Sequence, residues 1–198
     1  MRRFVVIGQT ATASPDFSID DVPGTSGRLD VLLRCVRAAL LVSHGVRRDT
    51  VIYLVLQGGP RAPRTVRIDG STSEYLRQDE RSLAGMLKAM LNWADEQTSF
   101  AKSLRGMSIA RGGLDVVLAD LGAYTPYVLE EGGKDLRGEP LRTGDPVFFI
   151  GDHQGFDAAT RARLAELGAK PVSVGPISLH ADDAIAIVQN EIDRASSE

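Results

Sequence analysis

The chain has 198 residues, of which 43% are hydrophobic and 25% are charged, and its formal net charge is −3. This length fits a single domain with an ordinary core, and the absence of an apolar stretch of 18 or more residues excludes a membrane-spanning helix. The single cysteine, Cys35, excludes an internal disulfide and a cysteine-rich metal site. We therefore expect one cytoplasmic domain over residues 1–198, without a metal.

The charge is unevenly distributed along the chain. Residues 1–114 hold 16 Lys and Arg against 11 Asp and Glu, whereas residues 115–198 hold 7 against 15. An acidic chain as a whole does not indicate a nucleic-acid-binding protein. The basic N-terminal part can still carry a local face for an anionic ligand, although a solvated surface explains the same asymmetry.

Apolar runs and turn residues predict alternating strands and helices in the first half. The helices are expected to begin at Ser26 and Asp79, whose side chains can cap them. The predicted elements are a strand at Phe4–Ile7, a loop at 8–25, a helix from Gly27 to about Ser43, strands at Thr50–Leu56 and Thr65–Ile68, and a helix from Arg81 to about Ala94. His44 is expected at the C-terminus of the first helix, as a partner of its dipole.

The middle of the chain is less clearly patterned. Met107–Ala110 reads as a strand or a short turn, and the spacing in Leu114–Leu121 fits a helix. Tyr124–Leu129 reads as a strand that ends at a Glu-Glu-Gly-Gly sequence. Residues 134–145 are expected to form a polar turn or a small hairpin.

The last third repeats the order strand, loop, helix. Val147–Ile150 is an apolar strand closed by Gly151, and a helix over Ala158–Leu167 can be capped by Asp157 and ended by Gly168. A second strand, Pro171–Val174, is followed by a helix from near Leu179. Ala181, Ala184, Ile185, Val188 and Ile192 share one face of that last helix.

This alternation is typical of an α/β protein with a parallel sheet. Ligands in such sheets bind at the carboxyl ends of strands, which here are Gly151-Asp152-His153 and Gly175-Pro176-Ile177. Glycine-ended strands can also be simple turns. Neither GxGxxG nor GxxxxGK[ST] occurs, so a Rossmann dinucleotide site and a P-loop are unsupported.

Four blocks of the sequence resemble one family. They are PGTSGRLDVLLRCVRAALLVSHGVRRD at 23–49, DERS at 79–82, FFIGDHQGF at 148–156 and SVGPISLHADDAI at 173–185. These blocks, in this order and spacing, are similar to those of the tRNA pseudouridine-54 N1-methyltransferase family, which belongs to the SPOUT class of trefoil-knotted methyltransferases. The resemblance extends over nearly the whole chain.

The resemblance implies a SPOUT-type parallel-sheet fold whose knot and cofactor region covers about 124–198. It also implies a homodimer, an RNA substrate that is most often tRNA, and S-adenosylmethionine as the cofactor. The residues carried over as cofactor-binding are Leu129, Ile150, Gly151, Val174, Gly175, Pro176, Ile177, Ser178, Leu179 and Ala184. Leu129, Ile150 and Leu179 could supply apolar walls, and the glycine loops could offer backbone hydrogen bonds.

Methyl transfer to a ring nitrogen needs two aligned atoms and removal of the N1 proton. Asp69, beside Arg67, is the candidate for orienting the base or accepting the proton, although Asp-Gly is also a common turn. The candidate RNA contacts are Arg28, Asp30, Arg61, Arg64 and Arg81. Each of these side chains could equally be an ordinary solvated surface group. His153 and His180 lie in the cofactor loops but need no acid or base role.

The start of the last helix departs from the family pattern. Some archaeal members carry a cysteine early in the last helix, where this chain has Ala181 and Ala184. That thiol is therefore not needed here, or the substrate differs. The alternatives are a SPOUT enzyme acting on ribosomal RNA pseudouridine or on a ribose 2′-O, and a non-catalytic RNA-binding dimer.

Overall fold

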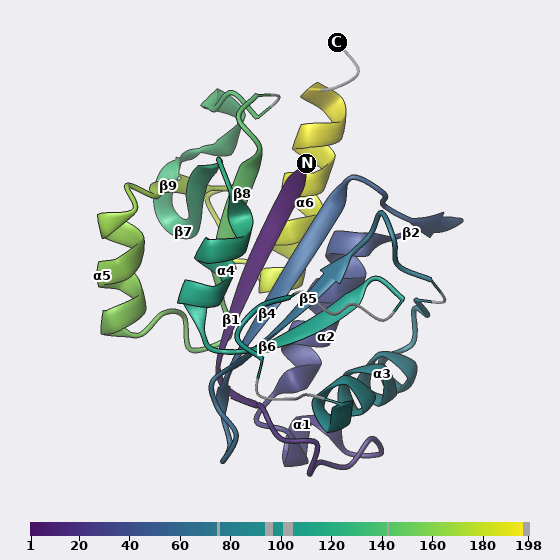
Figure 1. The fold of residues 1–198 in the computed structure, drawn as a ribbon. Coiled ribbons are helices and arrows are strands. Elements are labelled where there is room, and N and C mark those ends of the chain that lie inside the picture. The colour runs from purple at the N-terminus through teal and green to yellow at the C-terminus, as the bar shows by residue number, and fades with distance from the viewer. Residues whose placement is uncertain (75, 94–96, 101–104, 142, 196–198) are drawn as a thin grey trace.

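A computed structural model describes residues 1–74, 76–93, 97–100, 105–141 and 143–195. Within these ranges, seven strands form one mixed sheet in the order β6-β5-β4-β1-β8-β7-β9 (Figure 1). The sheet strands are β1 (Arg2–Thr12), β4 (Thr50–Gly58), β5 (Arg64–Asp69), β6 (Met107–Arg111), β7 (Thr125–Asp135), β8 (Pro146–Gly151) and β9 (Lys170–Ser173). β4, β1, β8, β7 and β9 run parallel, and β5 and β6 are antiparallel to their neighbours.

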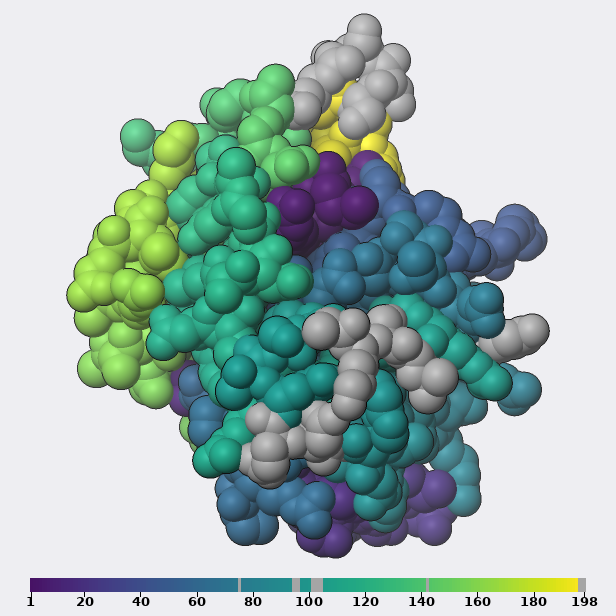
Figure 2. Space-filling view, in the orientation of Figure 1, coloured from purple at the N-terminus to yellow at the C-terminus, as the bar shows by residue number. Residues whose placement is uncertain are grey.

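Helices cover both faces of the sheet, which makes a three-layer α/β structure. Alternate strand residues point to opposite faces, so Val6 and Phe148 belong to one core while Val5 and Phe149 belong to the other. The first face carries α2 (Leu29–Leu40), α3 (Glu80–Trp93) and α6 (Ala181–Ala195), and the second carries α4 (Leu114–Leu121) and α5 (Ala158–Glu166). The space-filling view looks onto the face of α4 and α5 (Figure 2).

The predicted α/β order is confirmed, and several boundaries are corrected. The loop expected at 8–25 contains the second half of β1 and a short helix, α1 (Val22–Thr25). The helix expected to reach Ser43 stops at Leu40 and gives way to a small hairpin of β2 (Leu41–Val42) and β3 (Gly45–Val46). His44 therefore lies in a tight turn and not at a helix end, because the β-branched valines and Gly45 favour a hairpin here.

Local signals gave the correct helix starts elsewhere. Asp157 Oδ1 accepts the N–H of Thr160 at 2.7 Å, and Asp79 Oδ1 accepts the N–H of Ser82 at 2.8 Å. The end expected for α3, Ala94, lies outside the described residues. Met107–Arg111 is a strand, and the predicted helix at Leu114–Leu121 is confirmed.

The strand expected to end at Leu129 continues as β7 to Asp135, because Gly133 lets it approach β9 closely. A Cβ on Gly133 would come within 2.5 Å of the Val172 backbone in β9, so only glycine permits this close approach. The segment after it holds a short 3₁₀ helix, η1 (Leu136–Gly138), and not a hairpin. The predicted trefoil knot stays a prediction.

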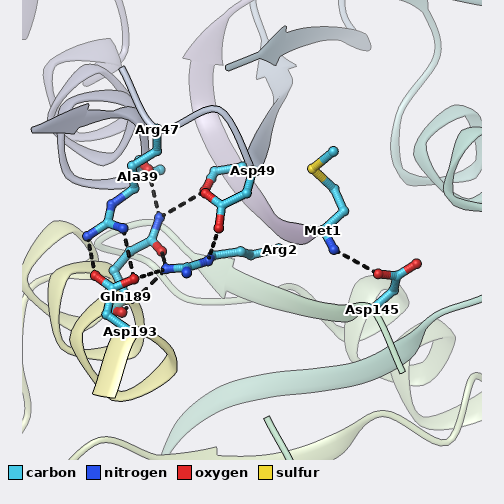
Figure 3. A network of polar contacts seen from close by, with 9 residues as sticks. Met1, Arg2, Ala39, Arg47, Asp49, Asp145, Gln189 and Asp193 are labelled. Atoms are coloured by element: carbon cyan, nitrogen blue, oxygen red, sulfur yellow. Dashed lines mark hydrogen bonds and ion pairs between the residues drawn. The ribbon is translucent and has the colours of Figure 1, made fainter. Parts of the chain in front are cut away.

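The start of β1 contacts the last helix, α6, through a network of polar side chains (Figure 3). Arg2 of β1 donates to Gln189 and to Asp193 of α6, at 2.7 and 2.6 Å. Arg47 binds the same Asp193 carboxylate at 2.6 Å. This network fixes α6 against β1 and α2, with Gln189 also donating to the Ala39 carbonyl at 2.7 Å. Among the described residues, no helix combines the length and the apolarity needed to cross a membrane.

Candidate functional site: a cavity at the carboxyl ends of the strands

A cavity of about 840 Å³ lies at the carboxyl ends of β8 and β9 and beside the middle of β7. The starts of α2 and α6 close its other side. β7 contributes at the point where its pairing with β9 shifts register, between Leu129 and Lys134. Such an irregularity turns side chains away from the regular alternation and is common beside binding sites. The cavity is thus where a parallel sheet most often holds a ligand.

Most of the residues expected to bind the cofactor line this cavity. Eight of the ten do so: Leu129, Ile150, Gly151, Val174, Ile177, Ser178, Leu179 and Ala184. Gly175 and Pro176 lie in the same loop but do not line the cavity. The structure therefore brings together three strand ends that are far apart in sequence. Their role in binding remains a prediction.

Gly151 lets the chain fold tightly at the cavity wall. A Cβ there would lie 2.6 Å from the backbone of Gly155, so any side chain must push that turn away. A hydrogen bond joins two segments of the cavity wall. Ser178 Oγ donates to Glu131 at 2.5 Å, which ties the loop before α6 to β7. The tight turn at Gly151 and the bond between Ser178 and Glu131 therefore fix parts of the cavity wall in position.

Charged residues that sequence reasoning missed also line the cavity. Asp152 is 8% exposed; its carboxylate accepts the N–H groups of Gln9 and of Gln154, each at 2.8 Å. Glu130 pairs with Arg161 at 2.6 Å. The sequence placed Asp152 at a strand end where ligands bind, but it was not counted among the residues expected to hold the cofactor. His153 and His180 line the cavity as well.

The candidate RNA contacts separate into two groups. Arg28 lines the cavity, and Arg61 and Arg81 are exposed on loops or helix ends, where Arg81 pairs with Asp20. Asp30 is 2% exposed and Arg64 is 5% exposed. Tertiary packing therefore buries both side chains, and their contact with RNA stays a prediction.

The candidate catalytic pair lies away from the cavity of its own chain. Asp69 of β5 pairs with Val51 of β4, and this register places Asp69 at the level of the start of β8. The cavity lies at the other end of β8, where the strand ends at Gly151. Three strand spacings and four residues of rise separate Asp69 from the cavity by roughly 20 Å. Within one chain, the structure does not bring Asp69 and Arg67 to the cofactor cavity.

Asp69 is held by a local network. Arg67 Nη2 donates to it at 2.8 Å, and the N–H and hydroxyl of Ser71 donate at 2.9 and 2.6 Å. Arg67 also contacts Asp120 at 3.1 Å. Burial would raise the pKa of Asp69, but the hydrogen bonds from Ser71 and the charge of Arg67 outweigh it and lower the pKa below its usual value. A carboxylate of this kind is a weak base.

Comparison with known proteins identifies the family and the fold. A family model described as "Putative SAM-dependent RNA methyltransferase" matches residues 1–197. Among solved structures, Nep1 of Archaeoglobus fulgidus bound to S-adenosylhomocysteine has the same fold, with a TM-score of 0.69. It is 18% identical, and the alignment covers 100% of this chain and 99% of that one.

Curated relatives are much closer in sequence. The tRNA (pseudouridine(54)-N(1))-methyltransferase of Methanosarcina acetivorans is 41% identical over 100% of this chain and 93% of its own length. The enzyme of the same name from Halobacterium salinarum is 43% identical over 98% of this chain and 97% of its own length. Identity at this level over the full length, together with the family model, shows common descent. The chain therefore belongs to the tRNA (pseudouridine(54)-N(1))-methyltransferase family.

Proposed function

We propose that this protein transfers a methyl group from S-adenosylmethionine to N1 of pseudouridine 54 in tRNA. The observation that carries the proposal is the full-length similarity, at about 40% identity, to enzymes named for that reaction. The cavity at the strand ends is consistent with it, because the residues expected to hold the methyl donor surround a single hollow.

The residues of the cavity fit the methyl donor chemically. Leu129 and Ile150 offer apolar walls for an adenosine, and Ile177 and Leu179 expose 72% and 42% of their surface beside the cavity. Large apolar side chains with such exposure gain by covering a ligand. The acidic groups Glu131 and Asp152 are suited to the cationic end of the donor. When bound, S-adenosylmethionine supplies an electrophilic methyl group on a sulfonium.

The protein's contribution to the reaction is positioning. The hydrogen bond between Ser178 and Glu131 limits how far the loop before α6 can move from β7. This restriction helps to keep the reacting atoms aligned. The N1 proton of the target base must leave as the nitrogen is methylated. Asp69 is proposed to orient the base or accept that proton. Because Asp69 lies far from the cavity of its own chain, this role requires a second chain.

We further propose a homodimer that acts in the cytoplasm, where its tRNA substrate is found. The distance between Asp69 and the cavity of its own chain supports the dimer, since a partner chain could bring the two together. Light scattering coupled to size-exclusion chromatography tests it. A mass of one chain at micromolar concentration would contradict the dimer and, with it, the role of Asp69.

The reaction is tested with purified protein, methyl-labelled donor and two tRNA transcripts that differ only in uridine or pseudouridine at position 54. We expect label only in the pseudouridine transcript, and nucleoside mass spectrometry should find the methyl group on the base. A methyl group on ribose, or equal labelling of both transcripts, would contradict the base assignment. Labelling of ribosomal RNA in place of tRNA would contradict the substrate assignment.

A further inference from the structure

The start of α2 places a charged pair at the wall of the cavity. Arg28 Nε and Nη2 donate to the two carboxylate oxygens of Asp30 at 2.9 and 3.1 Å, which is a bidentate pair. The Asp30 side chain is 3% exposed, whereas that of Arg28 is 43% exposed. The buried carboxylate therefore holds the guanidinium from behind and leaves its outer edge facing the cavity that Arg28 lines.

A second arginine completes the arrangement. Arg34 lies one helical turn after Asp30 in α2, and its Nη1 donates to Oδ2 of Asp30 at 3.0 Å. Arg34 also lines the cavity. Asp182 lies 3.7 Å from the Arg34 Nε, at the start of α6. Burial would raise the pKa of Asp30, but its bonds with the two arginines outweigh it and lower the pKa, so Asp30 is ionised at neutral pH.

The backbone at Arg28 is unusual for an arginine. Its φ of 69° and ψ of 37° lie in the left-handed region, which glycine adopts more easily than any residue with a side chain. The preceding Gly27 has φ 63°, and a Cβ there would overlap the Thr10 carbonyl oxygen. Thr10 Oγ1 donates to the Gly27 carbonyl at 3.0 Å, so β1 holds this turn in place.

A strained backbone at an arginine points to a use for its side chain. Fold stability alone would favour glycine at position 28, since the turn geometry is fixed by its neighbours. The Nη1 of Arg28 has no hydrogen bond or ion pair in the part of the chain that the structure describes. This nitrogen retains two N–H donors on a guanidinium whose direction is already set.

Charged groups of both signs line the cavity. Arg28 and Arg34 lie at the start of α2, whereas Glu131 lies in β7 and Asp152 follows β8. Arg161 lines the cavity as well, but it is paired with Glu130 of β7. Arg28 is close enough to Asp152 for the carboxylate charge to contribute to its raised pKa, after the larger effect of Asp30. A cavity lined by groups of both signs suits a ligand that carries both an oxygen anion and a cation.

We propose that Arg28 contacts an anionic oxygen of the bound ligands and that Asp30 is the residue that positions it. This inference rests on the proposed function, and it gives Arg28 and Asp30 a role in ligand binding at the proposed active site. The oxygen belongs either to the carboxylate of the methyl donor or to a phosphate of the RNA. Asp30 acts only through Arg28, and so it is a positioning residue.

The test uses Arg28→Gly, which fits the left-handed backbone and so separates function from folding. Isothermal titration with S-adenosylhomocysteine and the KM for tRNA are measured for it and for wild type. We expect one of the two constants to rise by about tenfold or more, consistent with the loss of a charge-assisted contact. A rise in the Kd for S-adenosylhomocysteine assigns the donor carboxylate, and a rise in the KM for tRNA alone assigns the RNA phosphate.

Two further variants separate positioning from general damage. Arg28→Lys keeps the charge but cannot make the two parallel bonds to Asp30, and we expect it to recover only part of the loss. Asp30→Asn should raise the same constant as Arg28→Gly. The double variant should add little to either, because both changes remove one contact.

The control is Arg37→Ala, an exposed arginine on the same helix away from the cavity, which should leave both constants unchanged. If Arg28→Gly folds and leaves both constants within twofold of wild type, the inference is overturned. If Asp30→Asn raises a different constant from Arg28→Gly, the positioning role is overturned. Absence of methyl transfer by wild-type protein would instead contradict the proposed function itself.

Discussion

Arg2 and Gln189 are joined at 2.7 Å, although 187 residues separate them. Arg2 begins β1, the central strand of the sheet, and Gln189 lies in α6, the last helix (Figure 3). Both residues are buried, at 8% and 2% exposure. Since α6 also supplies Ala181 and Ala184 to the cavity, this contact from the middle of the helix helps to fix one wall of the candidate site.

We expect Gln189→Leu to destabilise the protein by about 2–4 kcal/mol. The substitution leaves part of the Arg2 guanidinium and the Ala39 carbonyl without partners in the interior. Urea unfolding measures the loss. Asn190→Leu is the matched control on the exposed side of the same helix and should change stability by less than about 0.5 kcal/mol. Equal stability of the two variants would show that the network adds nothing.

Asp193 should make stability sensitive to acid. Burial would raise its pKa, but the hydrogen bonds from Arg47 and Arg2 outweigh burial and lower it below the usual value. The stabilisation from a lowered pKa is complete above the unfolded-state pKa, near 4, and is lost as the pH falls through the folded-state pKa. We expect Asp193→Asn to lose stability at neutral pH and to show a shallower decline below about pH 4. Parallel acid-unfolding curves would contradict this.

Local chemistry made much of the fold predictable. Asp79 and Asp157 stand directly before helices and cap them, and the apolar face of α6 follows the helical period. The pair Gly132-Gly133 gave a wrong strand end, because the role of Gly133 is set by β9, which lies about forty residues later. A glycine that permits a close approach looks the same in sequence as one that ends a strand.

The candidate site was predictable where it follows the strand ends. Gly151 and Val174 end apolar runs that follow one another in the sequence, and both line the cavity. The burial of Asp30 could not be predicted from local sequence, although its carboxylate pairs with Arg28, just before α2, and with Arg34, within it. The position of Asp69 depends on strand order, which local sequence does not determine. Burial and sheet order are properties of the whole chain.

We expect Gly151→Ala to weaken binding of S-adenosylhomocysteine by at least about tenfold. The new methyl group would come within 2.6 Å of the Gly155 backbone, so the turn that forms the cavity wall must move. Isothermal titration gives the affinity. Gly138→Ala, where the added Cβ meets nothing within 4 Å, is the control and should bind as wild type. Wild-type affinity in Gly151→Ala would mean that this turn does not hold the ligand.

Gly85→Ala should stabilise the protein by about 0.5–1 kcal/mol. Gly85 lies inside α3, and a Cβ at this position meets nothing within 4 Å. Alanine restricts the unfolded chain and favours the helix without a steric cost. Urea unfolding should show a higher midpoint with an unchanged slope. A lower midpoint would mean that α3 does not tolerate a side chain at position 85.

The role of Asp69 is tested by Asp69→Ala and Asp69→Asn. Because Asp69 lies roughly 20 Å from the cavity of its own chain, we expect the affinity for S-adenosylhomocysteine to stay within twofold of wild type. Turnover on pseudouridine-containing tRNA should fall by about tenfold or more in both variants, since neither side chain can carry the charge. Asp115→Ala, which removes a carboxylate that is 84% exposed, is the control. Retained turnover in Asp69→Asn but not in Asp69→Ala would mean that the hydrogen bonds to Ser71 and Arg67 matter and the charge does not. Wild-type turnover in both would remove Asp69 from the mechanism.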